Sequence, residues 1–252
     1  MRRGPALLAL LAVLPLLALL AAGCGEDPAD EGPLAAAAER TANEETSRFF
    51  MVMEAATKEE GEFRMEGTGS VTADNSRGRL TATVEFEGQE PVEFEIINVR
   101  DEFWLRSEGL DLPRGKRWMY SVDRSVAPST MTTREFLALI RESGEIEEVG
   151  GERVRGRATT HYKARVAFAD VYESSPEETR ERFRDRFEQF EDMELPIEVW
   201  IDGEGLVRRM DVDIARGGQE VSIRMEMLEF GVEVDTDPPP PAQVIDESEV
   251  PG

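Results

Sequence analysis

The chain of 252 residues has one cysteine, Cys24, and one histidine, His161. A disulfide bond within the chain and a zinc site of the Cys/His type are therefore excluded, because each needs more of these residues than the chain contains. A Cys–His nucleophile pair is disfavoured for the same reason. The chemistry open to Cys24 depends on the residues around it, which are those of an export signal.

Residues 1–23 have the three parts of a secretory signal: two arginines, a long apolar run and small residues at its end. The apolar run is long enough for a membrane-spanning helix, which is the alternative interpretation. Pro15 in the middle of the run, the small-residue exit and the acidic stretch after Cys24 favour a cleaved signal.

The segment Leu20-Ala21-Ala22-Gly23-Cys24 resembles a bacterial lipobox, with Ala21 where Leu, Val or Ile is usual. The resemblance implies that the Cys24 thiol carries a diacylglyceryl group and that the chain is cut just before it. We therefore expect a protein anchored in the membrane by its lipid, on the outer face of the cytoplasmic membrane. Two long acyl chains would hold it stably, since each buried CH₂ contributes about 0.8 kcal/mol.

The charge balance excludes several partners. The chain has 29 Lys and Arg residues against 53 Asp and Glu residues, a net charge of −24. Loss of residues 1–23 removes two arginines and no acid, so that 27 basic residues remain against 53 and the net charge becomes −26. Such a chain does not favour nucleic acid or anionic headgroups, which bind dense basic surfaces. We expect no nucleic-acid partner.

His161 falls among arginines and a lysine on one face of a predicted strand at residues 157–169, the face that we expect to meet solvent. A general base or an anion site is the functional alternative for this histidine. A surface or paired histidine is the interpretation that we favour.

The acidic residues have a diffuse pattern. Asp211 and Asp213 share a strand face, and Asp202 and Glu204 lie in a predicted turn, but no Asp-x-Asp-x-Asp-Gly calcium loop exists. The sequence also has no Gly-x-Ser-x-Gly, no P-loop and no dinucleotide fingerprint. We expect no catalytic residue, no metal and no cofactor, and therefore a protein that is not an enzyme.

In most of the segments that would position a site, apolar and charged residues alternate with period two. This pattern is typical of an antiparallel sheet with one apolar face and one charged face. Residues 46–57 are apolar on both faces, so a strand is preferred there with a helix as the alternative. Capping boxes and apolar stripes predict helices that start at Thr132 and at Ser175, after a short Ala-rich helix at residues 34–45. The fold class is α+β: a strongly curved antiparallel sheet with two to three helices on its concave face.

The residues that would point inward are methionines, phenylalanines and glycines. Methionine gives a deformable, polarizable wall, and glycine removes side-chain volume and lets strands bend. Such a face either encloses an apolar cavity or is an ordinary core with glycine kinks. The candidate cavity residues are Met51, Met53, Met65, Gly67, Gly69, Phe86, Phe94, Phe136, Ile140, Gly156, Phe183, Phe187, Met210 and Met225.

Two segments resemble recurrent segments of actinobacterial lipoproteins of the LppX/LprG type. They are residues 149–164 (VGGERVRGRATTHYKA) and residues 195–210 (LPIEVWIDGEGLVRRM), and residues 115–118 (GKRW) support them. The resemblance covers most of residues 35–235 and carries no catalytic residue. It implies a LolA/LolB-like half-barrel in which acylated lipids or glycolipids bind between the sheet and the helices.

The leading hypothesis is a lipid-anchored extracytoplasmic protein that binds or carries an apolar or acylated envelope lipid, or a lipoglycan. A sensor or protein-interaction module of the same fold, with an envelope protein partner, is the alternative, and a hydrolase that uses acidic residues is a third. The expected organisation is a signal peptide at 1–23, a lipidated acidic tether at 24–33, the LolA-like domain at 34–235, and a loosely held Pro-rich acidic tail at 236–252.

Overall fold

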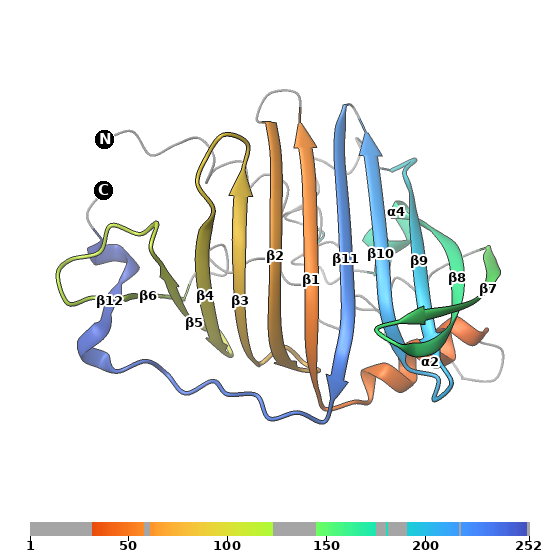
Figure 1. Ribbon diagram of the computed structural model, residues 1–252, viewed down its shortest axis with the longest axis horizontal. Coiled ribbons are helices and arrows are strands. Elements are labelled where there is room, and N and C mark those ends of the chain that lie inside the picture. Colours follow the sequence, from red (N-terminus) through yellow and green to blue (C-terminus); the bar gives the residue numbers. More distant parts are fainter. Residues whose placement is uncertain are drawn as a thin grey trace.

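The computed structural model describes residues 32–57, 61–122, 145–174, 180, 191–216 and 218–250. These residues form one large curved sheet with few helices (Figure 1). The helices are α2 (Pro33–Ala42) and α4 (Phe168–Ser174), with 3-10 helices η3 (Pro241–Gln243) and η4 (Glu247–Glu249). The strands are β1 (Thr46–Thr57), β2 (Gly61–Thr72), β3 (Arg77–Phe86), β4 (Val92–Val99), β5 (Glu102–Ser107), β6 (Trp118–Ser121), β7 (Ile146–Val154), β8 (Arg157–Ala167), β9 (Glu194–Asp202), β10 (Val207–Arg216), β11 (Gln219–Phe230) and β12 (Val244–Asp246).

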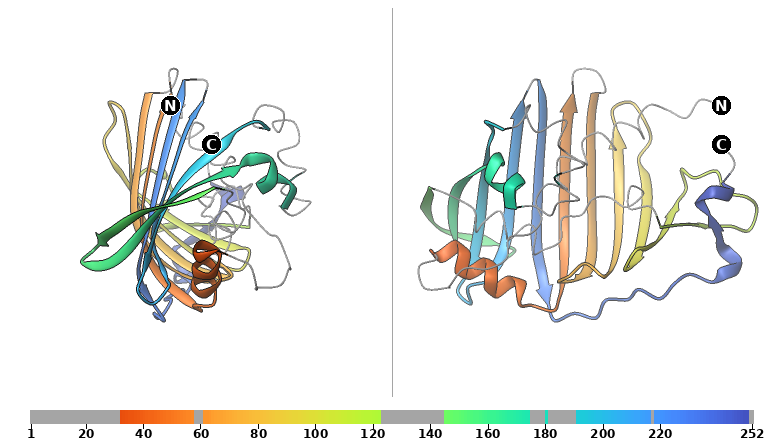
Figure 2. Two further views of the ribbon diagram at one scale, coloured as in Figure 1. Left: turned by 90° about the vertical axis from the view of Figure 1, so that its right-hand side faces the viewer. Right: turned by 180° about the vertical axis from the view of Figure 1, so that it is seen from behind.

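The strand order in the 12-stranded sheet is β12-β6-β5-β4-β3-β2-β1-β11-β10-β9-β8-β7. Two antiparallel meanders, β1 to β6 and β7 to β11, therefore meet in the middle of the sheet, where β1 pairs with β11. At one edge β12 pairs with β6 in parallel. Figure 2 shows that the sheet is strongly twisted and that α2 and α4 lie on the same side of it.

Residues 46–57 form a strand, as preferred from the sequence. The strand β1 lies at the centre of the sheet, paired with β2 on one side and with β11 on the other. A central strand forms backbone hydrogen bonds along both edges. This pairing stabilises the extended conformation of residues 46–57, which their sequence pattern alone left open.

We call the face that carries Met51, Met65, Met210 and Met225 the inner face, and the opposite face the outer face. The inner face is built in rows of residues that are paired across neighbouring strands. Val84, Met65, Met53, Ile223 and Val212 form one such row from β3 to β10. All five are buried in the main core cluster, so the register of the sheet assembles the core.

Helix α2 closes the lower end of the inner face in the view of Figure 1. Leu34, Ala37 and Ala38 belong to the same core cluster as the sheet. The Thr41 hydroxyl accepts a hydrogen bond of 2.9 Å from the Val207 amide, and Arg40 donates one to the Glu204 carbonyl. These contacts fix the helix to the β9–β10 turn. Within the described residues no helix is long and apolar enough to cross a membrane.

The prediction of a loosely held C-terminal tail is wrong. The chain after β11 runs along the lower edge of the sheet and adds β12 beside β6 (Figure 1). Arg77 donates to the Thr236 hydroxyl at 2.8 Å, and Val234, Thr236 and Ile245 are buried. The sheet therefore does not end at residue 235, because scattered apolar side chains in the acidic tail find partners on distant strands.

The prediction that Gly156 points inward and lines a cavity is also wrong. Gly156 is exposed in the turn between β7 and β8, where Arg155 has φ of 46° and Gly156 has φ of 83°. Two successive positive φ angles are those of a type I′ hairpin turn, which glycine enters without steric cost. Beyond this turn, β8 ends at Ala167 and helix α4 begins at Phe168, two residues before the predicted strand end. The helices predicted to start at Thr132 and Ser175 lie outside the described residues, except for single positions.

Candidate ligand-binding cleft

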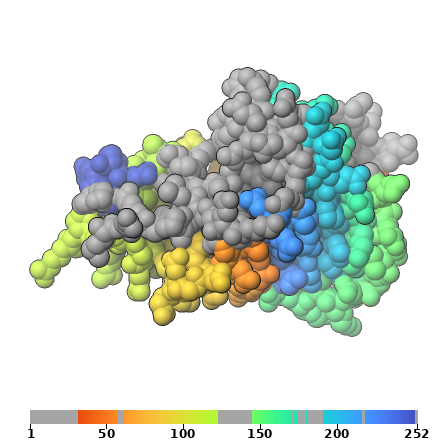
Figure 3. All heavy atoms as spheres, turned by 90° about the horizontal axis from the view of Figure 1, so that it is seen from above, coloured from red at the N-terminus to blue at the C-terminus, as the bar shows by residue number. Residues whose placement is uncertain are grey.

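A cleft of about 940 Å³ opens at the upper rim of the sheet in the view of Figure 1. It is bordered by the upper ends of β3, β2, β1, β11, β10, β9 and β8 and by the residue before β9, Met193. Figure 3, which looks down on this rim, shows the ends of these strands following one another in a row. The cleft is half-open to solvent along this rim.

The floor of the cleft is the uppermost row of the inner face. Phe86 pairs with Phe63, Phe63 with Ala55, Ala55 with Val221, and Val221 with Ile214, from β3 to β10. The rings of Phe63 and Phe86 lie 5.3 Å apart at an interplanar angle of 47°. Because paired residues share a face, this row offers a continuous apolar surface at the opening.

The next two rows down are closed. Met53 and Met65 lie directly below the cleft row, and Met51, Met210 and Met225 lie one row further. Their side chains are between 1% and 5% exposed, whereas Phe63, Phe86 and Ile214 are only partly buried. Five of the predicted cavity residues therefore extend the apolar face of the cleft into the core, and a sixth, Phe86, lines the cleft itself.

Gly67 and Gly69 provide close packing. A Cβ atom at Gly67 would lie 2.5 Å from the Ala82 Cβ, and one at Gly69 would lie 2.6 Å from the Phe49 Cζ. The space above Gly69 is therefore taken by an aromatic ring, so this glycine does not border an empty volume. Phe94 pairs with Ala82 and packs partly buried against the same core.

Several predicted residues lie outside the described part of the chain: Cys24, Phe136, Ile140, Phe183 and Phe187. The other four residues of the cleft floor were not predicted as site residues: Ala55, Phe63, Ile214 and Val221. All four have the parity of the predicted methionines on their strands. Their position at the ends of strands, where a sheet is least covered, was the signal that could have identified them.

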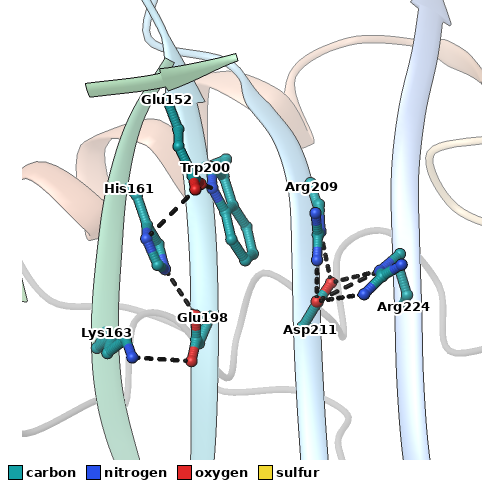
Figure 4. A network of polar contacts seen from close by, with 8 residues as sticks. All are labelled: Glu152, His161, Lys163, Glu198, Trp200, Arg209, Asp211 and Arg224. Atoms are coloured by element: carbon teal, nitrogen blue, oxygen red, sulfur yellow. Dashed lines mark hydrogen bonds and ion pairs between the residues drawn. The ribbon is translucent and has the colours of Figure 1, made fainter. Parts of the chain in front are cut away.

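His161 is buried, which corrects the expectation of a solvent-facing histidine. Its ring stacks on Trp200 with centroids 4.2 Å apart and an interplanar angle of 7° (Figure 4). Glu152 of β7 accepts a hydrogen bond from the Trp200 indole, and Glu198 approaches the His161 Nε2 to 2.7 Å. The strand pattern placed His161 on the correct, outer face, but the side chains of Trp200, Glu198 and Glu152 pack against it there.

The same network continues across the outer face to β11. The Arg209 guanidinium lies 4.2 Å from the centre of the Trp200 ring and donates to Asp211, which also pairs with Arg224 (Figure 4). The hydrogen bond to Asp211 raises the pKa of Arg209 above its ordinary value, despite partial burial of the group. Lys163 pairs with Glu198, and Arg209 and Arg224 pair with Asp211, so these charges form a paired structural network. Within the described residues no group of three His, Cys, Asp or Glu side chains could hold a metal ion.

No family model matches the sequence, and the search of curated proteins found no match. The structure is similar to that of LprF from Mycobacterium bovis, with a TM-score of 0.55 and 12% identity over 82% of this chain and 95% of that one. The Mycobacterium tuberculosis lipoprotein LppX has a TM-score of 0.48 and 15% identity, over 84% of this chain and 100% of that one. A LolA superfamily protein from Nitrosomonas europaea has a TM-score of 0.31 and 8% identity, over 78% of this chain and 92% of that one.

At these identities the likeness to LprF concerns the fold alone. It covers nearly all of that protein. The resemblance to LppX/LprG-type lipoproteins that the sequence predicted is therefore confirmed at the level of the fold.

Proposed function

We propose that the protein binds an apolar or acylated envelope lipid, with the acyl portion on the inner face of the sheet and access through the upper cleft. The observation that carries this proposal is the cleft row itself: five apolar residues from five strands lie side by side, and three of them, Phe63, Phe86 and Ile214, are only partly buried. Burial of an aliphatic chain on such a surface contributes about 25 cal/mol for each Å² removed from water. A volume of about 940 Å³ is in the range of small-molecule and cofactor sites.

The methionines below the cleft support the same proposal. Met53 and Met65 are unbranched and flexible, so they can change rotamer and admit a chain deeper into the core than the closed form allows. The lipobox-like segment that ends at Cys24 is consistent with a protein that works at a membrane surface.

The test is native mass spectrometry of the purified protein with the lipids that co-purify. Two variants with the same added charge make the comparison sharp. Ile214→Glu places a charge on the cleft floor, and Thr68→Glu places the same charge at an exposed outer-face position of β2 that does not border the cleft. We expect co-purified lipid with the wild type and with Thr68→Glu, and its loss with Ile214→Glu.

Ala55→Leu is the second cleft variant, which narrows the opening and adds no charge. Circular dichroism establishes that each variant is folded. Lipid bound equally by all of them would place the ligand elsewhere, and a wild type that carries no lipid would favour the sensor or interaction module.

We also propose that Cys24 carries the diacylglyceryl anchor. The support is the lipobox-like pattern, which ends at the only cysteine in the chain. In the Cys24→Ala variant we expect loss of the acyl mass and release from the membrane fraction. Retention of that variant in the membrane would instead indicate an uncleaved anchor helix at residues 1–23.

A further inference from the structure

The charges around the cleft are unbalanced. Seven acidic residues border it, whereas the basic residues among its described lining are Arg64 and Arg165. Both arginines are already paired with acids: Arg64 with Glu54 and Glu66, and Arg165 with Glu194. Both guanidinium groups are therefore neutralised by neighbouring carboxylates, and neither is free to receive an anionic ligand group.

Five of the bordering carboxylates make no ion pair within the described residues: Glu62, Glu85, Glu87, Asp213 and Glu220. Each is exposed and directly neighbours a residue of the cleft floor along its strand. Glu62 precedes Phe63, Glu85 and Glu87 flank Phe86, Asp213 precedes Ile214, and Glu220 precedes Val221. The apolar row is thus flanked by unpaired acids at four of its five positions, and by the paired Glu54 at the fifth, Ala55.

Strand alternation directs these acids to the outer side of the rim, one residue away from the floor. That separation is smaller than the Debye length, which is about 10 Å at 0.1 M salt. Their charges therefore act together on any head group that sits at the opening, and a cleft edged by one sign of charge concentrates the opposite sign.

We propose that the cleft selects an amphiphile whose head group is cationic, an amine or ammonium on an aliphatic chain. This inference rests on the proposed function and specifies the class of ligand. The tilted Phe63–Phe86 pair at the same opening favours the same head group, because aromatic faces attract cations. An anionic head group would meet five unpaired carboxylates and no free arginine among the described lining residues.

The test compares three probes with one chain length and small head groups: dodecylammonium, dodecanol and laurate. Each is used as a monomer to displace a fluorescent apolar dye, N-phenylnaphthylamine, from the purified protein. Screened Coulomb attraction from the five carboxylates predicts dissociation constants that rise in that order, about tenfold from the cation to the anion at low salt. The difference should shrink as salt is added.

The whole chain is acidic, so attraction of a cation needs a matched control. The test variant is Glu62→Gln/Glu85→Gln/Glu87→Gln, in which every changed residue borders the cleft and is exposed. The control variant removes the same charge at exposed positions away from it: Glu108→Gln/Asp111→Asn/Glu233→Gln. The cation-over-anion ratio should fall about threefold in the first variant and stay unchanged in the second.

The possible outcomes separate the two proposals. If dodecanol or laurate binds as tightly as dodecylammonium, or if both variants lower the ratio equally, the head-group inference is overturned while lipid binding by the cleft stands. If none of the three probes displaces the dye, the proposed function fails, and this inference fails with it.

Discussion

The inner and outer faces of the sheet are made from alternate residues of the same strands, but they are stabilised in different ways. On the inner face, rows such as Met65, Met53 and Ile223 exclude water and bring no charged group with them. On the outer face, Trp200, Arg209 and Asp211 bury part of their surface while pairing every charge. An apolar face can open at its end without leaving a polar group unsatisfied, whereas a paired network cannot.

This difference explains why the cleft is on the inner face. Removing cover from Phe63 or Ile214 exposes apolar surface that a lipid can cover again. Removing cover from the outer network would separate ion pairs that the fold has already arranged. The following predictions test whether the two faces differ in this way, from the largest expected effect to the smallest.

The largest effect is expected at Phe49, which fills the inner face above Gly69. Phe49→Ala should lower the free energy of unfolding by about 3–5 kcal/mol, because it leaves a cavity in a closed row. The neighbouring Phe50 lies on the outer face, with the Arg155 guanidinium 5.0 Å from its ring, and Phe50→Ala should cost about 1 kcal/mol. Urea denaturation measures both, and equal losses would contradict the difference between the faces.

Gly69→Ala should cost about 1–3 kcal/mol through overpacking, since the new Cβ would meet the Phe49 ring and the Arg79 carbonyl oxygen at 2.8 Å. In the Phe49→Ala background the cost should fall, because one of these two contacts is gone. The double-mutant cycle measures this coupling. Gly203→Ala is the control: no atom lies within 4 Å of its added Cβ, so its effect should be small. Additive losses of unfolding free energy at positions 49 and 69 would show that the Phe49 ring is not the reason why a glycine is needed at position 69.

On the outer face, Arg209→Met should lower the free energy of unfolding by about 1–2 kcal/mol. The variant removes the contact with Trp200 and leaves a mostly buried Asp211 with only Arg224. Arg48→Met is the comparison, because its pair with Glu229 is about half exposed and such pairs contribute about 0–1 kcal/mol. Thermal and urea unfolding decide between them, and a loss at Arg48 as large as that at Arg209 would contradict the network.

The smallest effect concerns Asp74, in the turn between β2 and β3. Hydrogen bonds from the Thr72 hydroxyl and from Ser76 lower its pKa to about 2 from an ordinary 3.8. A lowered folded-state pKa gives stability that is present above the ordinary value and is lost as pH falls from about 4 to about 2. Since the side chain is exposed, we expect only about 0.5 kcal/mol. Unfolding measured at several pH values should show a smaller acid loss in Asp74→Asn, and an identical pH dependence would rule out this contribution.

Strand alternation predicted most of the sheet, because the inner rows repeat with period two from β1 to β11. It did not predict Gly156 as a turn residue, since counting alternate residues runs through a two-residue turn without a break. Nor did it predict that Trp200 stacks on His161, or that Ile245 is buried beside β6, because both depend on contacts between segments distant in the sequence.

The chemistry of the candidate site was predicted better than its position. The methionines of the inner face were identified by their type and parity, but burial closes the rows that contain Met51, Met65 and Met210. The open row lies at the strand ends, and which row is open depends on how far each strand extends beyond its neighbours. That property comes from the register of seven strands and is not visible in any one of them.

The central claim is that an aliphatic chain enters along the inner face at the upper rim. The most direct measurement is photolabelling of the purified protein with a dodecylammonium that carries a diazirine on its chain, followed by residue-level mass spectrometry. We predict labels at Phe63, Phe86 and Ile214, with little at their outer-face neighbours Arg64, Glu85 and Asp213. Labels spread equally over both sets, or concentrated around Trp200, would contradict the claim.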